Sequence, residues 1–324
     1  MSFWVFLQHY LKNPSLYQTG KEIKQTKSAS NGIILAIMAA LLWGVSGTFA
    51  QFLFRERGIN VEWLVTTRLL ISGIVFMGIA IFNKDKGLTA IWKNKGDVVQ
   101  LLLFSIFGMI LVQYTYFAAI KHSNAATATV MQYAGPVLIA IYLAIKNRRW
   151  PSLTEYLAIL LAVAGTFLLV THGSFNSLSI SGLALFWGIL SAFALAFYTI
   201  QPVRLLEKYS SPVVIGWSML IGSVFFSFVH APWDAEGVYD IETFISLGFI
   251  IIFATLIAFY AYLTAVKSIG AQKTSLLASA EPLSAAIISV VWLNVSFGVM
   301  DWLGSFFIIS TIFLLTKNEK KAKS

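Results

Sequence analysis

The chain has 324 residues, of which 58% are hydrophobic and 11% are charged, and its net charge is +9. So few polar side chains cannot cover a soluble globule of this length, and the composition therefore indicates an integral membrane protein. The chain has no cysteine, which excludes disulfide bonds and thiolate metal or redox sites.

Residues 1–31 stand apart from the apolar part of the chain. One helical face collects apolar side chains before Pro14, namely Phe3, Phe6, Leu7, Tyr10 and Leu11. This spacing predicts an interfacial amphipathic helix that ends at Pro14; a tail without fixed structure is the alternative. Residues 21–31 are polar and predict a linker. We therefore expect residues 1–31 to form a cytoplasmic N-terminal segment.

Ten apolar segments follow, each close to the 20 or so residues that a helix needs to cross the hydrocarbon of a bilayer. Their limits are 33–54, 62–82, 98–120, 124–146, 152–171, 180–203, 212–230, 241–266, 272–293 and 299–316. Continuous apolar runs of this length predict an all-α membrane protein with ten transmembrane helices. The short alternating strands of a β-barrel would look different.

A repeat divides these segments into two sets. Residues 116–136 match residues 262–282 at a constant offset of 146 without a gap, and the residues that recur are Tyr116, Ala119, Lys121, Ala125, Ala134 and Pro136. Five apolar segments separate the start of one copy from the start of the other, and an odd number inverts the second copy in a bilayer. We therefore predict two inverted five-helix repeats, 32–173 and 178–316, followed by a basic cytoplasmic tail, 317–324. Inverted repeats are typical of secondary transporters.

The basic residues fall almost entirely on alternate loops. One set comprises Lys12, Lys21, Lys24, Lys27, Lys84, Lys86, Lys93, Lys95, Lys146, Arg148, Arg149, Arg204, Lys208, Lys267, Lys273, Lys317, Lys320, Lys321 and Lys323. The other side has only Arg55, Arg57 and Lys121. This distribution follows the positive-inside rule, places both termini in the cytoplasm, and argues against a nucleic-acid partner.

Two ionisable residues lie clearly inside the predicted spans, away from the span ends, where a charge is costly. Glu281 lies near the middle of the ninth span, and we expect it to face a cavity as a proton carrier or as the partner of a cationic substrate group. A structural carboxyl bonded to a neighbouring helix is the alternative. Arg68 in the second span could extend to the membrane surface, form an ion pair with Glu281, or bind a substrate carboxylate. If Arg68 bound a carboxylate and Glu281 an amine, the substrate would be an amino acid.

Several spans carry aromatic or polar side chains on one helical face. Trp187, Ser191, Ala194, Tyr198 and Gln201 are spaced by four and three residues in the sixth span, which predicts an inward-facing stripe. Further candidate substrate-binding residues are Trp43 in the first span, Tyr114 in the third and Gln132 in the fourth; the third span also offers Gln113 and Tyr116. Pro136 and Pro282 predict helix kinks. Faces of small residues such as that of the fourth span are also common in close helix packing.

The order of these features resembles a known family. Trp43-Gly44 stands in the first segment, Trp187-Gly188 opens the sixth, Pro136 lies in the fourth and Glu281-Pro282 in the ninth. The chain is similar here to the drug/metabolite transporter superfamily, in its EamA-type branch. The resemblance covers residues 32–316. It implies a carrier of the cytoplasmic membrane for small metabolites, many members being exporters, with a cavity lined by the first four spans of each repeat.

We therefore expect a secondary-active, proton-coupled exporter of small metabolites such as amino acids or amines, working by alternating access. The partners expected are the substrate, the lipid bilayer, protons and, in one arrangement, a second copy of the chain. No cofactor or metal is expected, because the sequence has no nucleotide-binding loop and its histidines lie far apart. A membrane-embedded receptor or enzyme without transport activity is the alternative.

Overall fold

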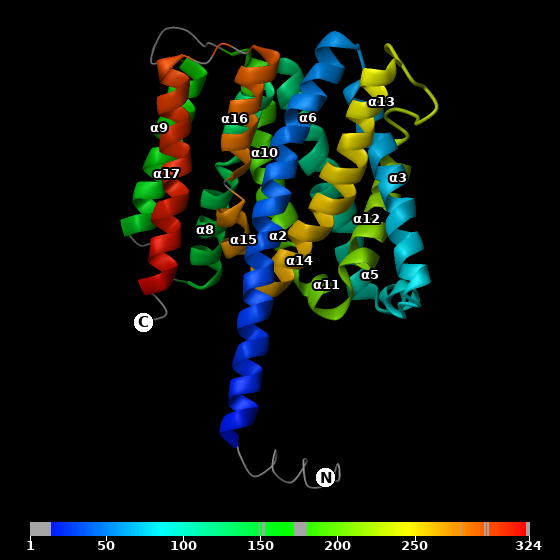
Figure 1. Ribbon diagram of the computed structural model, residues 1–324, viewed down its shortest axis with the longest axis vertical. Helices are drawn as coiled ribbons and strands as arrows, with labels where there is room; N and C mark the ends of the chain where they lie inside the picture. Colours follow the sequence, from blue (N-terminus) through cyan, green and yellow to red (C-terminus); the bar gives the residue numbers. More distant parts are fainter. Residues whose placement is uncertain are drawn as a thin grey trace.

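Figure 1 shows a computed structural model of the protein, a bundle of helices with one long helix projecting from its lower end. The structure describes residues 14–148, 150, 153–171, 180–278, 280–294, 296 and 298–321. Every regular element within these ranges is helical, which confirms the all-helical part of the predicted class. The predicted interfacial helix before Pro14 lies outside the described residues.

Within the described ranges, seven helices are long and apolar enough to cross a bilayer: Ser30–Glu56, Val61–Phe82, Lys95–His122, Ala125–Lys146, Gly182–Lys208, Ile241–Ile269 and Ala271–Leu293. Shorter apolar helices lie within three further predicted spans, at Tyr156–Gly165, Ser211–Phe226 and Val299–Thr311. Large apolar side chains such as Ile74, Phe186 and Phe306 are exposed on the bundle. A surface of this kind is stable against lipid, and the chain is an integral membrane protein.

The elements of the first half of the chain are α2 (Pro14–Glu56), α3 (Val61–Phe82), α4 (Gly87–Ala90), the 3₁₀-helix η1 (Ile91–Lys93), α5 (Lys95–Leu103), the π-helix η2 (Phe104–Ile110), α6 (Leu111–His122), α7 (Ala125–Gln132), α8 (Gly135–Lys146) and α9 (Leu153–Thr171). Those of the second half are α10 (Gly182–Ile200), α11 (Val203–Lys208), α12 (Ser211–Phe226), α13 (Ile241–Gly248), the π-helix η3 (Phe249–Ile257), α14 (Ala258–Ile269), α15 (Ala271–Leu277), α16 (Ala280–Leu293) and α17 (Val299–Lys321).

Polar side chains define where many of these helices begin. The Asn60 side chain accepts hydrogen bonds from the backbone N–H groups of Glu62 and Trp63 at the start of α3. The same role is filled at α5, α7, α10, α12 and α13 by Asn94, Asn124, Ser181, Ser210 and Asp240. Such caps satisfy N–H groups that have no partner within the helix, and they fix the first turn of each element.

Four long helical segments change their geometry near the middle of the bundle. The π-helices η2 and η3 interrupt the segments Lys95–His122 and Ile241–Ile269. Helix α7 ends at Gln132 and α8 begins at Gly135, directly before Pro136; α16 begins at Ala280, two residues before Pro282. Proline has no N–H group to continue the helical hydrogen bonds, so backbone groups are left free beside both prolines.

The predicted linker at residues 21–31 is wrong in one respect: α2 runs through it as a continuous helix from Pro14 to Glu56. The segment is polar, but it is made mostly of residues that tolerate or favour a helix, such as lysine, glutamine, glutamate and alanine. Proline is also well suited to the first turn of a helix. The polarity of residues 21–31 therefore predicted a linker, whereas the helix propensity of the same residues favours an extension of α2.

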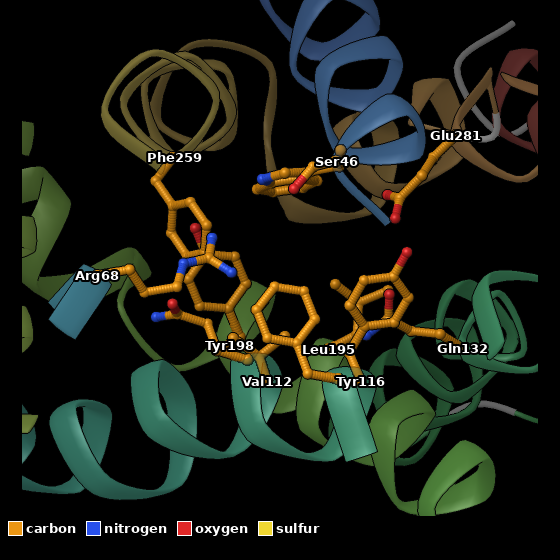
Figure 2. Close-up of a pocket in the computed structure, with 12 residues that line it drawn as sticks. Ser46, Arg68, Val112, Tyr116, Gln132, Leu195, Tyr198, Phe259 and Glu281 are labelled. Atoms are coloured by element: carbon orange, nitrogen blue, oxygen red, sulfur yellow. The ribbon is translucent and has the colours of Figure 1, made fainter. Parts of the chain in front are cut away.

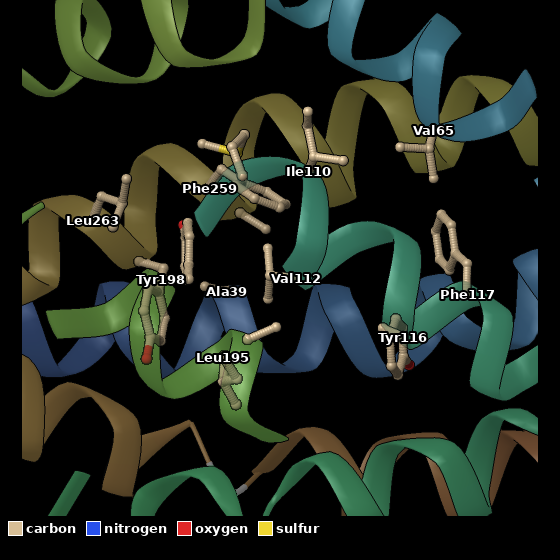
Figure 3. Close-up of a cluster of buried hydrophobic side chains, with 14 of the residues drawn as sticks. Ala39, Val65, Ile110, Val112, Tyr116, Phe117, Leu195, Tyr198, Phe259 and Leu263 are labelled. Atoms are coloured by element: carbon tan, nitrogen blue, oxygen red, sulfur yellow. The ribbon is translucent and has the colours of Figure 1, made fainter. Parts of the chain in front are cut away.

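The two halves of the chain are joined by several pairs of closely packed helices and do not form separate bodies. Helix α2 packs on α14 and α16, α10 on α6 and α7, and α3 on α12, so each of these pairs joins the two halves. Helices α9 and α17 form a further pair at the edge of the bundle (Figure 1). Figure 3 shows side chains from α2, α3, α6, α10 and α14 meeting in the middle of the bundle, among them Val112, Tyr198 and Phe259.

The crossing of α2 and α16 provides a test of this packing. A Cβ atom added at Gly44 would lie 1.9 Å from the Ser284 hydroxyl oxygen and 2.6 Å from the Glu281 carbonyl oxygen. We expect Gly44→Ala to lower the free energy of unfolding by about 1–3 kcal/mol, because the backbones must move apart. Thermal unfolding of the purified protein measures this. Gly78→Ala is the matched control, since nothing lies within 4 Å of its added Cβ; equal stability of the two variants would contradict the close crossing.

Candidate functional site

A cavity lies in the middle of the bundle, where the two halves of the chain meet. The space in it that is open to the centre of a water-sized molecule is about 40 Å³. The lining residues are Trp43, Ser46, Arg68, Val112, Gln113, Tyr116, Phe117, Gln132, Leu195, Tyr198, Phe259 and Glu281. They come from α2, α3, α6, α7, α10, α14 and α16. The cavity wall is therefore mainly aromatic and aliphatic, with a small number of polar groups at its ends (Figure 2).

The structure brings five of the seven sequence-predicted binding residues to this cavity, namely Trp43, Arg68, Gln132, Tyr198 and Glu281. Tyr114 and Trp187 lie elsewhere, with their rings in edge contact at 5.3 Å. The Tyr114 hydroxyl donates to the carboxylate of Glu62 at 2.9 Å, near the start of α3. These two aromatic residues pack together between the halves and do not line the cavity.

The third span contributes four lining residues: Gln113 and Tyr116, which the sequence offered, and Val112 and Phe117, which it did not. Gln113, Tyr116 and Phe117 are spaced by three and four residues and so share one face of α6, away from Tyr114. The repeat could have identified this face, because Gln113 and Phe259 correspond at the offset of 146 and both line the cavity. Leu195 and Ser46 carry no signal that separates them from ordinary packing residues.

Glu281 lies at one end of the cavity and is 3% exposed. The Tyr133 hydroxyl donates to its Oε2 atom at 3.0 Å and also contacts the Ala278 carbonyl oxygen at the end of α15. The Tyr116 hydroxyl points toward the same carboxyl group in Figure 2. Tyr133, which reasoning from the sequence missed, therefore links the break in the fourth span to the break in the ninth.

Arg68 lies at the opposite end of the cavity in Figure 2. Its side chain is 3% exposed and does not reach the membrane surface. The Nε atom donates to the Thr255 hydroxyl at 3.0 Å, and that hydroxyl in turn donates to the Ile250 carbonyl at 2.7 Å within η3. No carboxylate of the described residues lies within ion-pair distance of this guanidinium, so the ion pair between Arg68 and Glu281, one of the three predicted alternatives, does not form in this conformation.

Aromatic rings join the two polar ends. The Trp43 indole N–H donates to the Ala254 carbonyl at 2.9 Å, which fixes the ring against Phe259 and Tyr262 at 5.2 and 5.0 Å. Tyr198 stacks on Tyr262 at 5.8 Å. Rings held in this way present apolar faces and quadrupoles to the cavity, and they can contact the apolar or cationic part of a bound molecule.

Charged contacts join the two halves of the chain at the upper end of the bundle (Figure 1). We call Arg57, Asp240 and Glu242 the upper latch. The Arg57 Nε atom lies 2.9 Å from Asp240 Oδ2, and the guanidinium also contacts Glu242. A backbone hydrogen bond joins the same two segments, because the Val238 N–H donates to the Arg57 carbonyl at 2.8 Å. The upper latch joins the turn after α2 to the start of α13, at the upper end of the bundle in Figure 1.

A second set of contacts, the lower latch, comprises Asp97, Lys208 and Tyr209. Lys208 Nζ lies 2.7 and 3.0 Å from the two carboxylate oxygens of Asp97, and the Tyr209 hydroxyl donates to Oδ2 at 2.9 Å. The Asp97 side chain is 3% exposed, whereas that of Asp240 in the upper latch is 38% exposed. The lower latch joins α5 to α11, at the lower end of the bundle in Figure 1.

The upper latch keeps its charge over the physiological pH range. The hydrogen bond from the Thr243 N–H, together with the nearby Arg57, lowers the pKa of Asp240 from its ordinary 3.8. A carboxylate with a lowered pKa contributes its stabilisation above its ordinary pKa and loses it as pH falls through the lowered value. The contact between Asp240 and Arg57 therefore keeps its charge down to a pH below 3.8, the ordinary pKa of the aspartate.

Comparison with known proteins gives matches along the whole bundle. The family model described as the EamA-like transporter family matches residues 30–171 and 182–317. The chain is 38% identical over 294 residues to an inner membrane transporter of Salmonella typhimurium, YicL, described as uncharacterized; the match covers 91% of this chain and 98% of YicL. It is 26% identical to a transporter of Bacillus subtilis, YetK, also described as uncharacterized, over 78% of each chain.

A solved crystal structure of another protein has the same fold. Its chain is 18% identical to this one and superposes with a TM-score of 0.63, covering 91% of this chain and 99% of that one. At this identity the likeness concerns the fold alone.

The anchoring of Arg68 can be tested through Thr255. In Thr255→Val the Arg68 Nε atom loses its acceptor, so we expect the free energy of unfolding to fall by about 1–3 kcal/mol, the cost of an unsatisfied buried group. Thr255→Ser keeps the hydroxyl and is the control. Thermal unfolding of both variants measures the difference, and a valine variant as stable as the serine variant would show that the hydrogen bond does not hold Arg68.

Proposed function

The chain belongs to the EamA-like transporter family, and from this we propose that it is a secondary-active carrier that exports small metabolites such as amino acids or amines. In the proposal, ten spans form two inverted five-helix repeats that work by alternating access. Both termini face the cytoplasm, Glu281 carries the coupled proton, and two copies of the chain could associate. The observation that carries the proposal is a central cavity walled by both halves, with charged contacts that join the halves at each end of the bundle.

The inverted repeat is supported by the helix boundaries. Residues 95–103 form α5, and Ile241, 146 positions after Lys95, begins α13. The caps Asn94 and Asp240, the π-helices η2 and η3, and the helix breaks before Pro136 and Pro282 correspond at about the same offset. The second half thus repeats the helix interruptions of the first half. This repetition supports two structurally related units, each able to bend at equivalent places.

The latches occupy comparable places in the two halves, although their residues do not align at the offset of 146. Asp97 lies in the first turn of α5, and Asp240 caps its equivalent, α13. Their basic partners, Arg57 and Lys208, precede α3 and α12, the second helices of the two halves. An inverted repeat places equivalent contacts at opposite membrane faces. Opening one latch while the other stays closed is therefore the simplest motion that would expose the cavity to one side at a time.

The orientation is supported by the elements that carry the basic residues. The segments α4 with η1, the end of α8, and α11 all lie at the lower end of the bundle in Figure 1, together with the ends of α2 and α17 that are nearest the termini. Under the positive-inside rule this end faces the cytoplasm. The upper latch would then close the external side and the lower latch the cytoplasmic side.

Alternating access predicts opposite effects of the two latches. In a Ser46→Cys background, we expect Asp240→Asn to increase labelling of the cavity by an impermeant thiol reagent from outside several-fold. Asp97→Asn should increase labelling from the cytoplasmic side. The chain has no other cysteine, and asparagine caps a helix as well as aspartate does, so Asp240→Asn removes the charge alone.

Labelling rates in right-side-out and inverted vesicles measure these changes. The control is Gly78→Cys in α3, which has open space around it and should label equally in all latch variants. An increase from the same side for both variants, or from neither side, would contradict alternating access through these latches.

Proton coupling predicts a separable role for Glu281. In proteoliposomes we expect Glu281→Gln to retain exchange of substrate for substrate but to lose uptake driven by a pH gradient, because glutamine cannot bind and release a proton. Glu207→Gln, in the exposed part of α11, is the control and should keep both activities. Gradient-driven uptake that survives in Glu281→Gln would remove Glu281 from the coupling step.

A further inference from the structure

We infer that the substrate carries a carboxylate group and that Arg68 binds it with the terminal nitrogens of its guanidinium. The inference rests on the proposed transport function and narrows its substrate class, from amino acids or amines to organic carboxylates with an apolar body. Neutral amino acids are the first members of this class to test.

The first argument is that Arg68 has donors to spare. A guanidinium has five N–H groups, and only the one on Nε has a partner among the described residues, the Thr255 hydroxyl. The terminal nitrogens carry the other four in a planar fork that matches both oxygens of a carboxylate. A lysine ammonium would not impose this geometry. The unused part of the group is therefore suited to a bidentate anion.

The second argument is that the charge is held in place without being neutralised. Arg68 is 3% exposed, and its guanidinium carbon lies 4.9 Å from the centre of the Phe117 ring and 5.7 Å from that of Phe259. Aromatic faces stabilise a cation to some extent, but they do not replace a counter-ion in a medium of low dielectric constant. Glu281, at the other end of the cavity, does not supply one (Figure 2).

The third argument comes from a second polar group on the same wall. Gln113 lines the cavity and is 2% exposed. Its Nε2 atom donates to the Met109 carbonyl at 3.0 Å, whereas its Oε1 atom is buried without a partner among the described residues. A buried acceptor of this kind costs free energy until a donor arrives. Gln113 can accept a hydrogen bond from an N–H group of the substrate, as the ammonium of an amino acid would donate.

The remaining wall fits the rest of such a molecule. Trp43, Phe117, Tyr198 and Phe259 supply apolar faces to the cavity. An unpartnered guanidinium, an unpartnered amide oxygen and aromatic walls together select for a carboxylate with an apolar body. With the carboxylate on Arg68, Glu281 is left free to exchange protons.

The experiment compares four ligands that differ only in their charged groups: leucine, leucinamide, 3-methylbutylamine and 4-methylpentanoate. Counterflow in proteoliposomes reports transport of each, and thermal shifts of the detergent-purified protein report binding. For the wild type we expect the two carboxylates to be carried at least tenfold better than the amide and the amine. In Arg68→Gln this preference should disappear, with carboxylate exchange reduced roughly tenfold to 100-fold.

Three further variants separate binding from folding. Arg68→Lys keeps the charge without the fork and should recover part of the carboxylate preference. Arg148→Gln removes an exposed arginine outside the cavity and should change nothing. Without ligand, Arg68→Gln should be at least as stable as the wild type, because it removes a buried charge that has no counter-ion; a large loss of stability would indicate a structural arginine and overturn the inference.

The outcomes also separate this inference from the proposed transport function. Equal exchange of amine and carboxylate by the wild type, or a carboxylate preference retained in Arg68→Gln, would overturn the carboxylate site. If the protein exchanged a nucleoside or a polyamine but none of the four ligands, the carboxylate site would also be overturned. The transport function would still stand in that case. Absence of exchange across the whole panel would contradict the transport proposal itself.

Discussion

The free-energy cost of keeping a charged or polar group away from water governs the middle of this protein. Backbone groups freed by the interruptions in the long helices find partners on other helices: the Trp43 indole binds the Ala254 carbonyl in η3, and Tyr133 reaches the Ala278 carbonyl at the end of α15. Many buried polar side chains are satisfied by carbonyl groups one turn earlier in their own helix. Arg68, Gln113 and Tyr198 differ at the cavity, because each lines it and has a polar group without a partner among the described residues.

The sequence predicted much of this arrangement because hydropathy and repeats reflect simple physical requirements. A bilayer demands long apolar helices, so the limits of segments such as 62–82 agree closely with Val61–Phe82. The cost of burying charge distinguishes Arg68 and Glu281 from the ionisable residues near the ends of the predicted spans, and both line the cavity. The constant offset of 146 likewise predicted that the fourth and ninth segments behave alike, and both are divided beside a proline.

Other features depended on geometry that hydropathy does not encode. A π-helical turn adds a residue per turn and rotates the face that follows it, so α6 presents Gln113 and Phe117 to the cavity and directs Tyr114 to Trp187. Trp187 appeared equivalent to Trp43 in the aligned halves, but only Trp43 lines the cavity. The helical extension of α2 through residues 21–31 was missed because polarity and helix propensity give opposite indications there.

The unequal burial of the two latches has a consequence for the environment in which the protein works. Exposed ion pairs weaken as salt rises, whereas buried pairs are screened much less. The upper latch has carboxylates that are 38% and 61% exposed, while Asp97 of the lower latch is 3% exposed. With the upper latch on the external side, the ionic strength of the medium would shift the resting balance toward an outward-facing state.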